Sequence, residues 1–225
     1  MMLRQVLVIA VLHLVFATRP GIDIAISGVF FREDTGFWLN DSAVAIFVRN
    51  TIWNASYAFC ALAVLLLIVG FFRRGWGNVT TRIWGVVVLL FALAPGLLVN
   101  GILKQFWGRA RPRDIKEFGG ELTFSPPFEM VSECFSNCSF VSGEASLVTA
   151  TSIGIFLAFR GDIHPTFRWP FGAAVVVLLL AGAGMRVASG GHFTSDVVFS
   201  ALFTALIARA LYLLLGPERA AARAR

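Results

Sequence analysis

Long runs of apolar residues constrain this chain more than any other feature of its sequence. Six runs approach or exceed the roughly 20 residues that a helix needs to cross a hydrocarbon core of about 30 Å, and charged residues concentrate between them. We place these runs at about 3–18, 52–72, 82–103, 141–160, 167–185 and 193–215. Because the runs do not alternate, and because a bilayer offers no water to backbone groups, we expect helices and not barrel strands.

The composition supports a membrane protein. Hydrophobic residues make up 57% of the chain and charged residues only 14%, compared with about 25% charged residues in soluble domains. We therefore predict an all-α, polytopic fold in which residues 1–225 form a single domain, a bundle of six transmembrane helices. The first run is short and follows Arg4, so a cleaved signal peptide is the alternative there; the absence of a small-x-small cleavage site favours a retained helix.

The distribution of cations predicts an orientation. An even number of spans puts both chain ends on one side of the membrane. The two sides carry similar numbers of cations, but many of those on the opposite side lie in the loops around 104–116 and at Arg186. If these cations are functional, they should be left out of the comparison. The positive-inside rule then favours chain ends in the cytoplasm, including the tail with Arg219, Arg223 and Arg225. The cationic loops would then face the outer side of the membrane. The net charge of +6 comes without the basic stripe of a nucleic-acid-binding protein, so we expect anionic lipid as the partner.

A first cluster of functional residue types follows the third run, where Lys104, Arg109, Arg111 and Arg113 occur together. A guanidinium presents a planar fork of donors that matches phosphate oxygens, and an ammonium adds a point charge. Cations also complement helix C-termini and are common at membrane edges, so an interfacial cluster is the alternative. We interpret the cluster as a phosphate clamp.

A second cluster, Ser142-Gly143-Glu144, begins the fourth run. Free backbone N–H groups at a helix start favour an anion, and Gly143 lets the backbone approach it closely. The alternative is an ordinary helix start, in which Ser142 is the N-cap and Glu144 complements the helix dipole.

A third cluster lies between the fifth and sixth runs and contains Arg186, His192 and Asp196. A His and an Asp four residues apart lie on one helical face, so Asp196 can accept the imidazole N–H and fix which ring nitrogen faces a substrate. This predicts a nucleophile with its orienting carboxylate; a structural His at a membrane edge is the alternative. In the six-span arrangement all three clusters fall at the same membrane face, which favours one shared site.

Together the clusters resemble the signature of the type 2 phosphatidic-acid phosphatase superfamily, which reads Lys-x6-Arg-Pro, Pro-Ser-Gly-His and Ser-Arg-x5-His-x3-Asp. The matching positions are Lys104 and Arg111-Pro112, then Ser142-Gly143, then Arg186, His192 and Asp196. The stretches 20–23, Pro-Gly-Ile-Asp, and 139–144 are most similar to bacterial lipid A phosphatases within that superfamily.

The resemblance implies a lipid phosphatase that needs no metal and no cofactor and forms a phospho-histidine on His192, with Asp196 holding the ring. It assigns phosphate binding to Lys104, Arg111, Ser142, the Gly143 amide and Arg186. The substrate would be a phosphorylated membrane lipid: a lipid A 1-phosphate, a polyprenyl diphosphate or phosphatidylglycerophosphate. The sequence itself shows no metal-ligand spacing.

Three positions depart from the family pattern. Val141 replaces Pro and Met185 replaces Ser, which we regard as minor. Glu144 replaces the His that protonates the leaving group in the family. Either repulsion by the phosphate keeps Glu144 protonated, so that it serves as the acid, or the substrate is a sugar 1-phosphate or a diphosphate that needs no strong acid. A water molecule or a tyrosine is a further alternative as the proton donor, although neither Tyr57 nor Tyr212 lies near the motifs in sequence.

Cys134 and Cys138 lie on the predicted outer side of the membrane. In an oxidising periplasm they would form a disulfide that tightens the loop before Ser142; two free thiols are the alternative.

Three other functions compete with hydrolysis. A phosphotransferase would use the same His192 with a lipid acceptor in place of water, and a non-catalytic lipid-binding homologue is conceivable because of Glu144. A transporter or channel is disfavoured, since few ionisable residues lie in mid-span.

Overall fold

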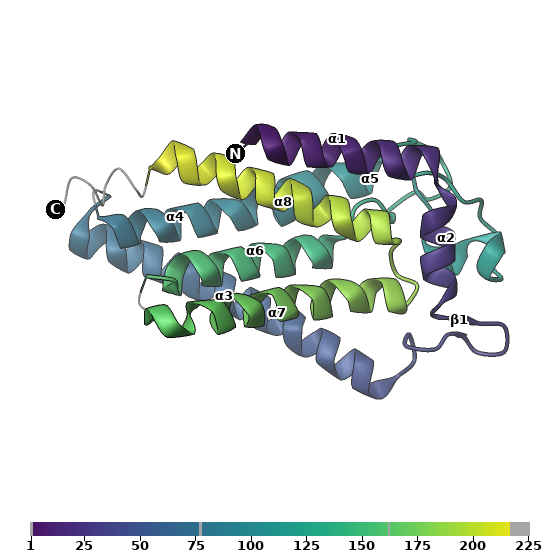
Figure 1. The fold of residues 1–225 in the computed structure, drawn as a ribbon, viewed down its shortest axis with the longest axis horizontal. Helices are drawn as coiled ribbons and strands as arrows, with labels where there is room; N and C mark the ends of the chain where they lie inside the picture. The colour runs from purple at the N-terminus through teal and green to yellow at the C-terminus, as the bar shows by residue number, and fades with distance from the viewer. Residues whose placement is uncertain (1, 77, 162, 217–225) are drawn as a thin grey trace.

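A computed structural model describes residues 2–76, 78–161 and 163–216 of this chain. The tail arginines of the orientation argument lie outside the described residues. The long helices run side by side along one axis (Figure 1). They are α1 (Met2–Thr18), α3 (Ala43–Arg74), α4 (Val79–Phe91), α6 (Gly143–Phe159), α7 (Arg168–Ala188) and α8 (Thr194–Leu215).

Each of the six ranges expected to cross the membrane overlaps one of these helices. Among the residues that the structure describes, four helical stretches are long and apolar enough to do so, and they are Ala43–Arg74, Val79–Phe106, Pro165–Ala188 and Thr194–Leu215. Helix α1 passes the same test only together with α2 (Gly21–Gly28), from which it is bent by 83°, and α6 has 17 residues. The all-α membrane fold is confirmed, whereas six crossings remain a prediction.

The start of α3 is where the observed helix differs most from the expected range. The sequence prediction began at 52, but the helix begins at Ala43, directly after Ser42, whose hydroxyl accepts a first-turn N–H at 3.3 Å. The charge of Arg49 interrupts the apolar pattern, which is why the prediction started after it. The structure accommodates that charge by pairing it with Glu144 of α6.

Helix α4 continues as a π-helix, Ala92–Leu103, and ends in the short α5, Lys104–Phe106. Pro95 lies inside the π-helix and cannot donate a backbone hydrogen bond. The Asn100 side chain donates to the Pro95 carbonyl at 2.6 Å. The widened helix delivers Lys104 to the end of the bundle.

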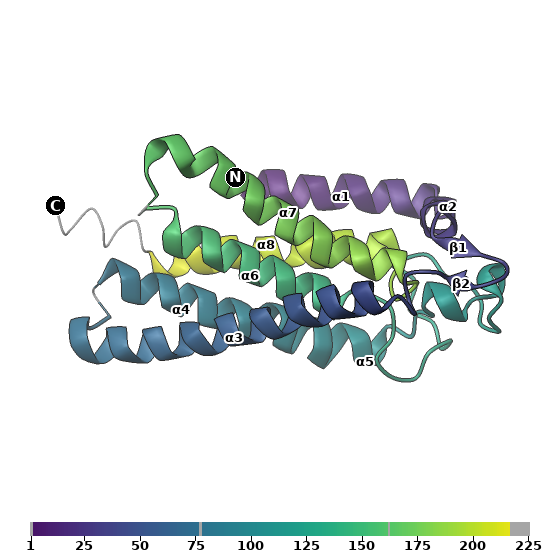
Figure 2. The same ribbon diagram turned by 90° about the horizontal axis from the view of Figure 1, so that it is seen from below.

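Helix α6 is the central element of the bundle. It contacts α3, α4, α7 and α8, and Figure 2 shows it between α3 and α7. Glycines permit this close packing: a Cβ at Gly154 would lie 2.7 Å from the Phe59 ring, and one at Gly182 would lie 2.9 Å from Val148. Small residues at helix contacts are typical of membrane bundles.

One end of the bundle is covered by shorter elements. Helix α2 runs across it, followed by an antiparallel hairpin of β1 (Phe31–Arg32) and β2 (Gly36–Phe37) (Figures 1 and 2). The loop between α5 and α6 folds over the same end and contains two 3₁₀ turns, Pro112–Asp114 and Lys116–Phe118; a further 3₁₀ turn, Pro165–Phe167, precedes α7 at the other end. The start of α6, the end of α7 and the start of α8 all meet under this cover.

Candidate active site

The residues singled out at three places in the sequence meet at the covered end of the bundle. Lys104 comes from α5, Arg186 from the last turn of α7 and His192 from the loop between α7 and α8. With Arg111 and Gly143 they line a single cavity of about 630 Å³. The structure therefore brings side chains from all three clusters to one place.

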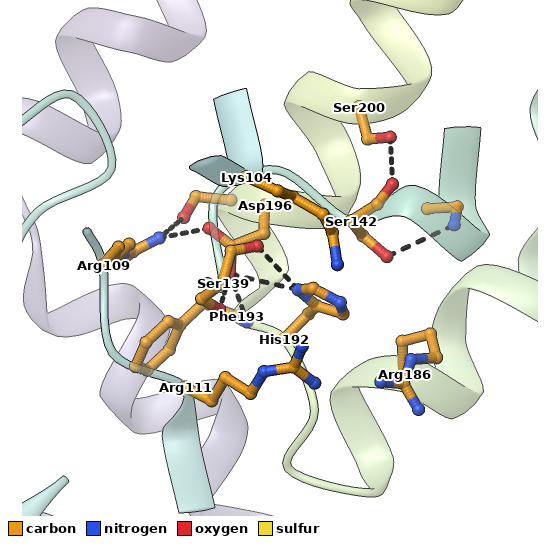
Figure 3. A network of polar contacts seen from close by, with 12 residues as sticks. Lys104, Arg109, Arg111, Ser139, Ser142, Arg186, His192, Phe193, Asp196 and Ser200 are labelled. Carbon is orange, nitrogen blue, oxygen red and sulfur yellow. Dashed lines mark hydrogen bonds and ion pairs between the residues drawn. The ribbon is translucent and has the colours of Figure 1, made fainter. Parts of the chain in front are cut away.

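Ser142 and Asp196 lie behind the cavity wall and are fully buried (Figure 3). The Ser142 hydroxyl accepts the Ala145 N–H at 3.2 Å and so caps α6, as in the alternative interpretation of the second cluster. Its neighbour Gly143 faces the cavity, and a Cβ there would lie 2.8 Å from the Asn100 side chain. Only glycine fits at this position without displacing a neighbour.

His192 is 1% exposed, and its Nδ1 lies 2.7 Å from the Ser139 carbonyl oxygen. We expected Asp196 to accept this N–H, and that expectation needs correction: Asp196 Oδ2 lies 3.8 Å from Nδ1, an ion-pair distance that is too long for a hydrogen bond. The carbonyl can only accept, so Nδ1 carries the proton and Nε2 carries the lone pair. Figure 3 shows Nε2 on the side of the ring away from Asp196.

The electrostatic surroundings favour a neutral His192. Burial, reinforced by repulsion from Arg186 and Lys104, lowers the pKa of His192 from its usual 6.5 to about 3, although the nearby Asp196 acts in the opposite direction. At neutral pH the imidazole is therefore uncharged, and its Nε2 lone pair is available to an electrophile in the cavity.

Asp196 is held by donors on both of its oxygens. Oδ2 accepts the Ser139 hydroxyl at 2.5 Å and the Phe193 backbone N–H at 2.9 Å, while Oδ1 accepts Arg109 Nη1 at 2.6 Å. Together these three donors hold the carboxylate in one orientation. Ser139 links Asp196 to His192: its hydroxyl donates to Asp196, and its backbone carbonyl accepts from the imidazole. Asp196 thus orients His192 partly through Ser139.

Arg109 joins this carboxylate to a second one on another helix. Its guanidinium is fully buried, stacks over the Phe193 ring at 4.3 Å and binds Asp23 of α2 at 2.9 Å. Asp23 also accepts the backbone N–H and the hydroxyl of Ser195. Sequence reasoning assigned no role to Asp23 and counted Arg109 in the phosphate clamp. The interpretation of Arg109 needs correction, because its guanidinium is buried, binds Asp23 and Asp196 and does not line the cavity. The similarity of residues 20–23 to lipid A phosphatases was the available signal for Asp23.

Glu144 faces the cavity but is bound by two guanidinium groups. Arg49 of α3 donates to it through Nε at 2.8 Å and Nη2 at 2.5 Å, and Arg186 Nε lies 3.5 Å away. Two neighbouring cations stabilise the ionised carboxylate. This arrangement argues against the protonated Glu144 considered from the sequence. Arg49 is a further site residue that the sequence prediction left out.

Asn137 connects the two cations of the first motif. Its side-chain oxygen accepts Lys104 Nζ at 2.7 Å, and its carbonyl accepts Arg111 Nη2 at 2.6 Å. Asn137 has a positive φ of 50° and lies between Cys134 and Cys138, which form a disulfide in the structure. The short loop closed by these cysteines therefore positions both phosphate-binding candidates.

Away from its cationic end the cavity continues as an apolar arm. Trp53, Tyr57 and Val64 of α3 line one side of this arm, and Val88 and Pro95 of the following helix line the other. Tyr57 lies far from the motifs in sequence, yet it lines the same cavity as His192. A cavity with one cationic end and one apolar arm suits an amphiphile with an anionic head group.

A helical membrane bundle that gathers a neutral histidine and several cations at one cavity has the organisation of a membrane-embedded phosphoryl-transfer enzyme. The chain belongs to the PAP2 superfamily, whose family model matches residues 85–219. This range contains every residue of the three motifs.

Three relatives named lipid A 4′-phosphatase are similar to the chain. The protein from Rhizobium leguminosarum is 31% identical over 211 residues, covering 88% of each chain, and that from Rhizobium etli (strain ATCC 51251) is 32% identical over 211 residues, covering 88% of this chain and 80% of the relative. The protein from Francisella tularensis subsp. novicida (strain U112) is 36% identical over 110 residues, 48% of this chain and 46% of the relative. No solved structure matches the chain. Family and relatives together identify a phosphatase, a phosphoric-ester hydrolase.

Proposed function

We propose that this protein hydrolyses a phosphate monoester on a membrane glycolipid of the lipid A type through a phospho-histidine on His192. The observation that carries the proposal is the neutral, buried imidazole at a cavity that has cations at one end and an apolar arm at the other. Four cations line this cavity, and they are Arg49, Lys104, Arg111 and Arg186.

In the first displacement Nε2 of His192 attacks the phosphorus atom, a P–N bond forms, and the P–O bond to the lipid breaks. The lipid oxygen takes a proton from a water molecule, and the lipid leaves as the alcohol. Lys104, Arg111, Arg186 and the Gly143 amide neutralise the charge on the phosphoryl oxygens. Ser139 keeps the proton on Nδ1, and the negative charge of Asp196 stabilises the cationic ring that results.

In the second displacement a water oxygen attacks the same phosphorus atom, the water gives up a proton to solvent, and the P–N bond breaks. Inorganic phosphate leaves, and His192 returns to its neutral form. If a lipid hydroxyl took the place of water, the same site would act as a phosphotransferase.

Asp23 and Arg109 support this chemistry from a distance. Neither residue lines the cavity, so we assign them as positioning residues and not as catalytic ones. Arg109 holds the Oδ1 side of Asp196 and leaves Oδ2 facing His192, while Asp23 fixes the guanidinium itself. Second-layer contacts of this kind are how proteins hold reacting groups in productive geometry.

The apolar arm and the relatives guide the substrate assignment. The arm lies between α3 and the following helix, where an acyl chain can lie beside Trp53 and Pro95. Because the relatives are named lipid A 4′-phosphatase, we assign the 4′-phosphate of a lipid A-type glycolipid, although sequence reasoning favoured a 1-phosphate or a diphosphate. We place the protein in a bacterial inner membrane with this cavity facing the periplasm.

We propose that Glu144 orients Arg49 and Arg186 and is not the general acid. Glu144→Gln keeps the shape of the side chain and removes a charge that repels the phosphate, so KM should fall or stay unchanged while kcat drops by less than about tenfold. Loss of a true general acid lowers kcat by about 100-fold or more. A kcat loss of that size, equal on a sugar phosphate and on phosphatidic acid, would restore the acid role.

The function is tested by phosphate release from four lipids in detergent, with EDTA present throughout. The lipids are lipid A, undecaprenyl diphosphate, phosphatidylglycerophosphate and phosphatidic acid, and the control enzyme is His192→Ala. We expect release by the wild type alone, greatest from lipid A and restricted to its 4′-phosphate. Release from none of them would contradict hydrolysis and favour a phosphotransferase or a lipid-binding homologue.

A further inference from the structure

A second, smaller cavity adjoins the first and is also cationic. It has a volume of about 180 Å³ and lies between the start of α3, the end of α7 and the loop after α5. Four guanidinium groups line it, together with the polar side chains of Asn40 and Ser189, and no carboxylate lines it. The four arginines are Arg49, Arg111, Arg113 and Arg186.

Three of these arginines also line the cavity that contains His192, so the two cavities are neighbours separated by shared side chains. Arg113 belongs to the smaller cavity alone. Its backbone N–H donates to the Gly190 carbonyl at 3.2 Å, which fixes its loop against the loop that carries His192. The nearest carboxylate to Arg113 is Asp114 at 3.8 Å, in a pair that is 45% and 43% exposed and therefore contributes little.

The guanidinium of Arg186 can donate a further hydrogen bond. Its side chain is 8% exposed, and its Nε, 3.5 Å from Glu144, makes no hydrogen bond to any described residue. A buried guanidinium N–H without an acceptor is costly, so an anion that reached it would be bound with a favourable free energy.

The net positive charge of the side chains that line the two cavities exceeds the negative charge of a single phosphate. Five cationic side chains line them, the four arginines and Lys104, and Glu144 is the one carboxylate in either lining, which leaves four positive charges with His192 neutral. A phosphate monoester carries a charge of about −2 at neutral pH, so about two positive charges stay uncompensated. Uncompensated charge is expensive near a membrane interior.

We propose that the smaller cavity is a subsite for a second anionic group of the same lipid, either a second phosphate or the carboxylate of an acidic sugar. The subsite rests on the proposed function, because its neighbour holds the reacting phosphate. Arg113 and Arg49 bind the second group, and Arg111 and Arg186 lie between the two anions. The subsite selects lipids with two anionic groups over lipids with one.

The test compares three glycolipids with identical acyl chains: one with the reacting phosphate only, one with a second phosphate and one with an acidic sugar. Arg113→Gln should raise KM by about tenfold, the loss expected for one charge-assisted hydrogen bond, for at least one of the doubly anionic lipids. The KM of the singly phosphorylated lipid should change by less than about twofold. Asn40→Asp, which adds a carboxylate to the cavity and keeps Arg113, should have the same selective effect.

Lys116→Gln is the matched control, because it removes one positive charge from the same loop and Lys116 lines neither cavity. It should leave the preference among the three lipids unchanged. An equal change of KM for all three lipids with Arg113→Gln, or no change for any, would overturn the subsite.

Binding of the same lipids to His192→Ala protein in nanodiscs separates the subsite from the proposed function. If the wild type released no phosphate, the function would fail. A selective weakening of binding by Arg113→Gln in that background would still support the subsite, and unselective or unchanged binding would overturn it.

Discussion

His192 is buried, and the proposed mechanism requires its imidazole to become charged during turnover. Burial lowers the pKa of His192 to about 3, so the imidazole stays neutral in the folded protein. In the unfolded chain the same imidazole is protonated with a pKa near 6.5. Acidification then adds protons to the unfolded chain first, and the free energy of unfolding falls as the pH drops from about 6.5 toward 3. This part of the stability is fully present only above pH 6.5.

We therefore expect His192→Gln, which cannot titrate, to lose less stability than the wild type between about pH 7 and pH 4. Thermal unfolding in detergent across this range measures the difference. Parallel losses in the two proteins would mean that other groups govern acid sensitivity.

In the proposed mechanism, Asp23 acts on the reaction through Arg109 and Asp196. Asp23→Asn places an amide N–H opposite the guanidinium, which should disturb Asp196 and lower kcat by about tenfold, or ~1.4 kcal/mol, with KM unchanged. In an Asp196→Asn background the same change should cost nothing further, because the route to His192 is already lost.

Ser27→Ala provides the control for that experiment. Ser27 is buried four residues further along α2, and its hydroxyl has no hydrogen-bond partner among the described residues. Its removal should leave kcat unchanged. If the effects of Asp23→Asn and Asp196→Asn on kcat were fully additive, Asp23 would have only a structural role. A loss of stability without a loss of kcat in Asp23→Asn would lead to the same conclusion.

The local spacing of residues decided which parts of the site could be predicted. Lys104, Arg111, Arg186 and His192 belong to motifs whose spacing is visible in the sequence, and the structure places all four at one cavity. The partners that hold the site together come from remote segments: Arg49 is 95 residues from Glu144, and Arg109 is 86 residues from Asp23. A single sequence carries no signal for such pairs, because burial and tertiary packing create them.

At the scale of elements, the loop between Cys134 and Cys138 has a defined task. Its Asn137 accepts hydrogen bonds from both Lys104 and Arg111, so the disulfide holds two phosphate-binding side chains in place before substrate arrives. Cys134→Ser with Cys138→Ser should raise KM by about threefold to tenfold, through ordering costs of ~0.5–1.5 kcal/mol, with little change in kcat.

Reductant should shift the KM of the wild type in the same way and leave the double variant unaffected. An unchanged KM in the double variant would show that packing alone orders this loop.

The helices themselves were predicted better than their ends and bends. Apolar runs revealed the six long helices, but Arg49 hid the first turns of α3. Pro20 and Gly21 mark the 83° bend between α1 and α2 as a turn, but they do not predict its angle. After the bend, α2 lies across the end of the bundle, where its Asp23 binds Arg109. Such geometry depends on a partner that apolar periodicity does not encode.

At the scale of the whole molecule, charge is divided between the two ends of the bundle. The end opposite the cavity carries Arg73, Arg74, Arg82, Arg160 and Arg168 at helix termini and turns (Figure 1). The positive-inside rule places this end in the cytoplasm once the cavity cations are counted as functional. A reporter that works only in the cytoplasm, fused after Arg225, should therefore be active. Activity from a periplasm-dependent reporter alone would invert the orientation.

The central claim is that His192 carries the phosphoryl group during turnover. The most direct measurement is rapid acid-free quenching of the enzyme with a lipid labelled in its reacting phosphate, followed by peptide mapping of the label. We predict an acid-labile, alkali-stable label on the peptide containing His192, formed within one turnover, lost as phosphate is released and absent from His192→Ala. Turnover without a labelled protein, or normal phosphate release by His192→Ala, would contradict the account.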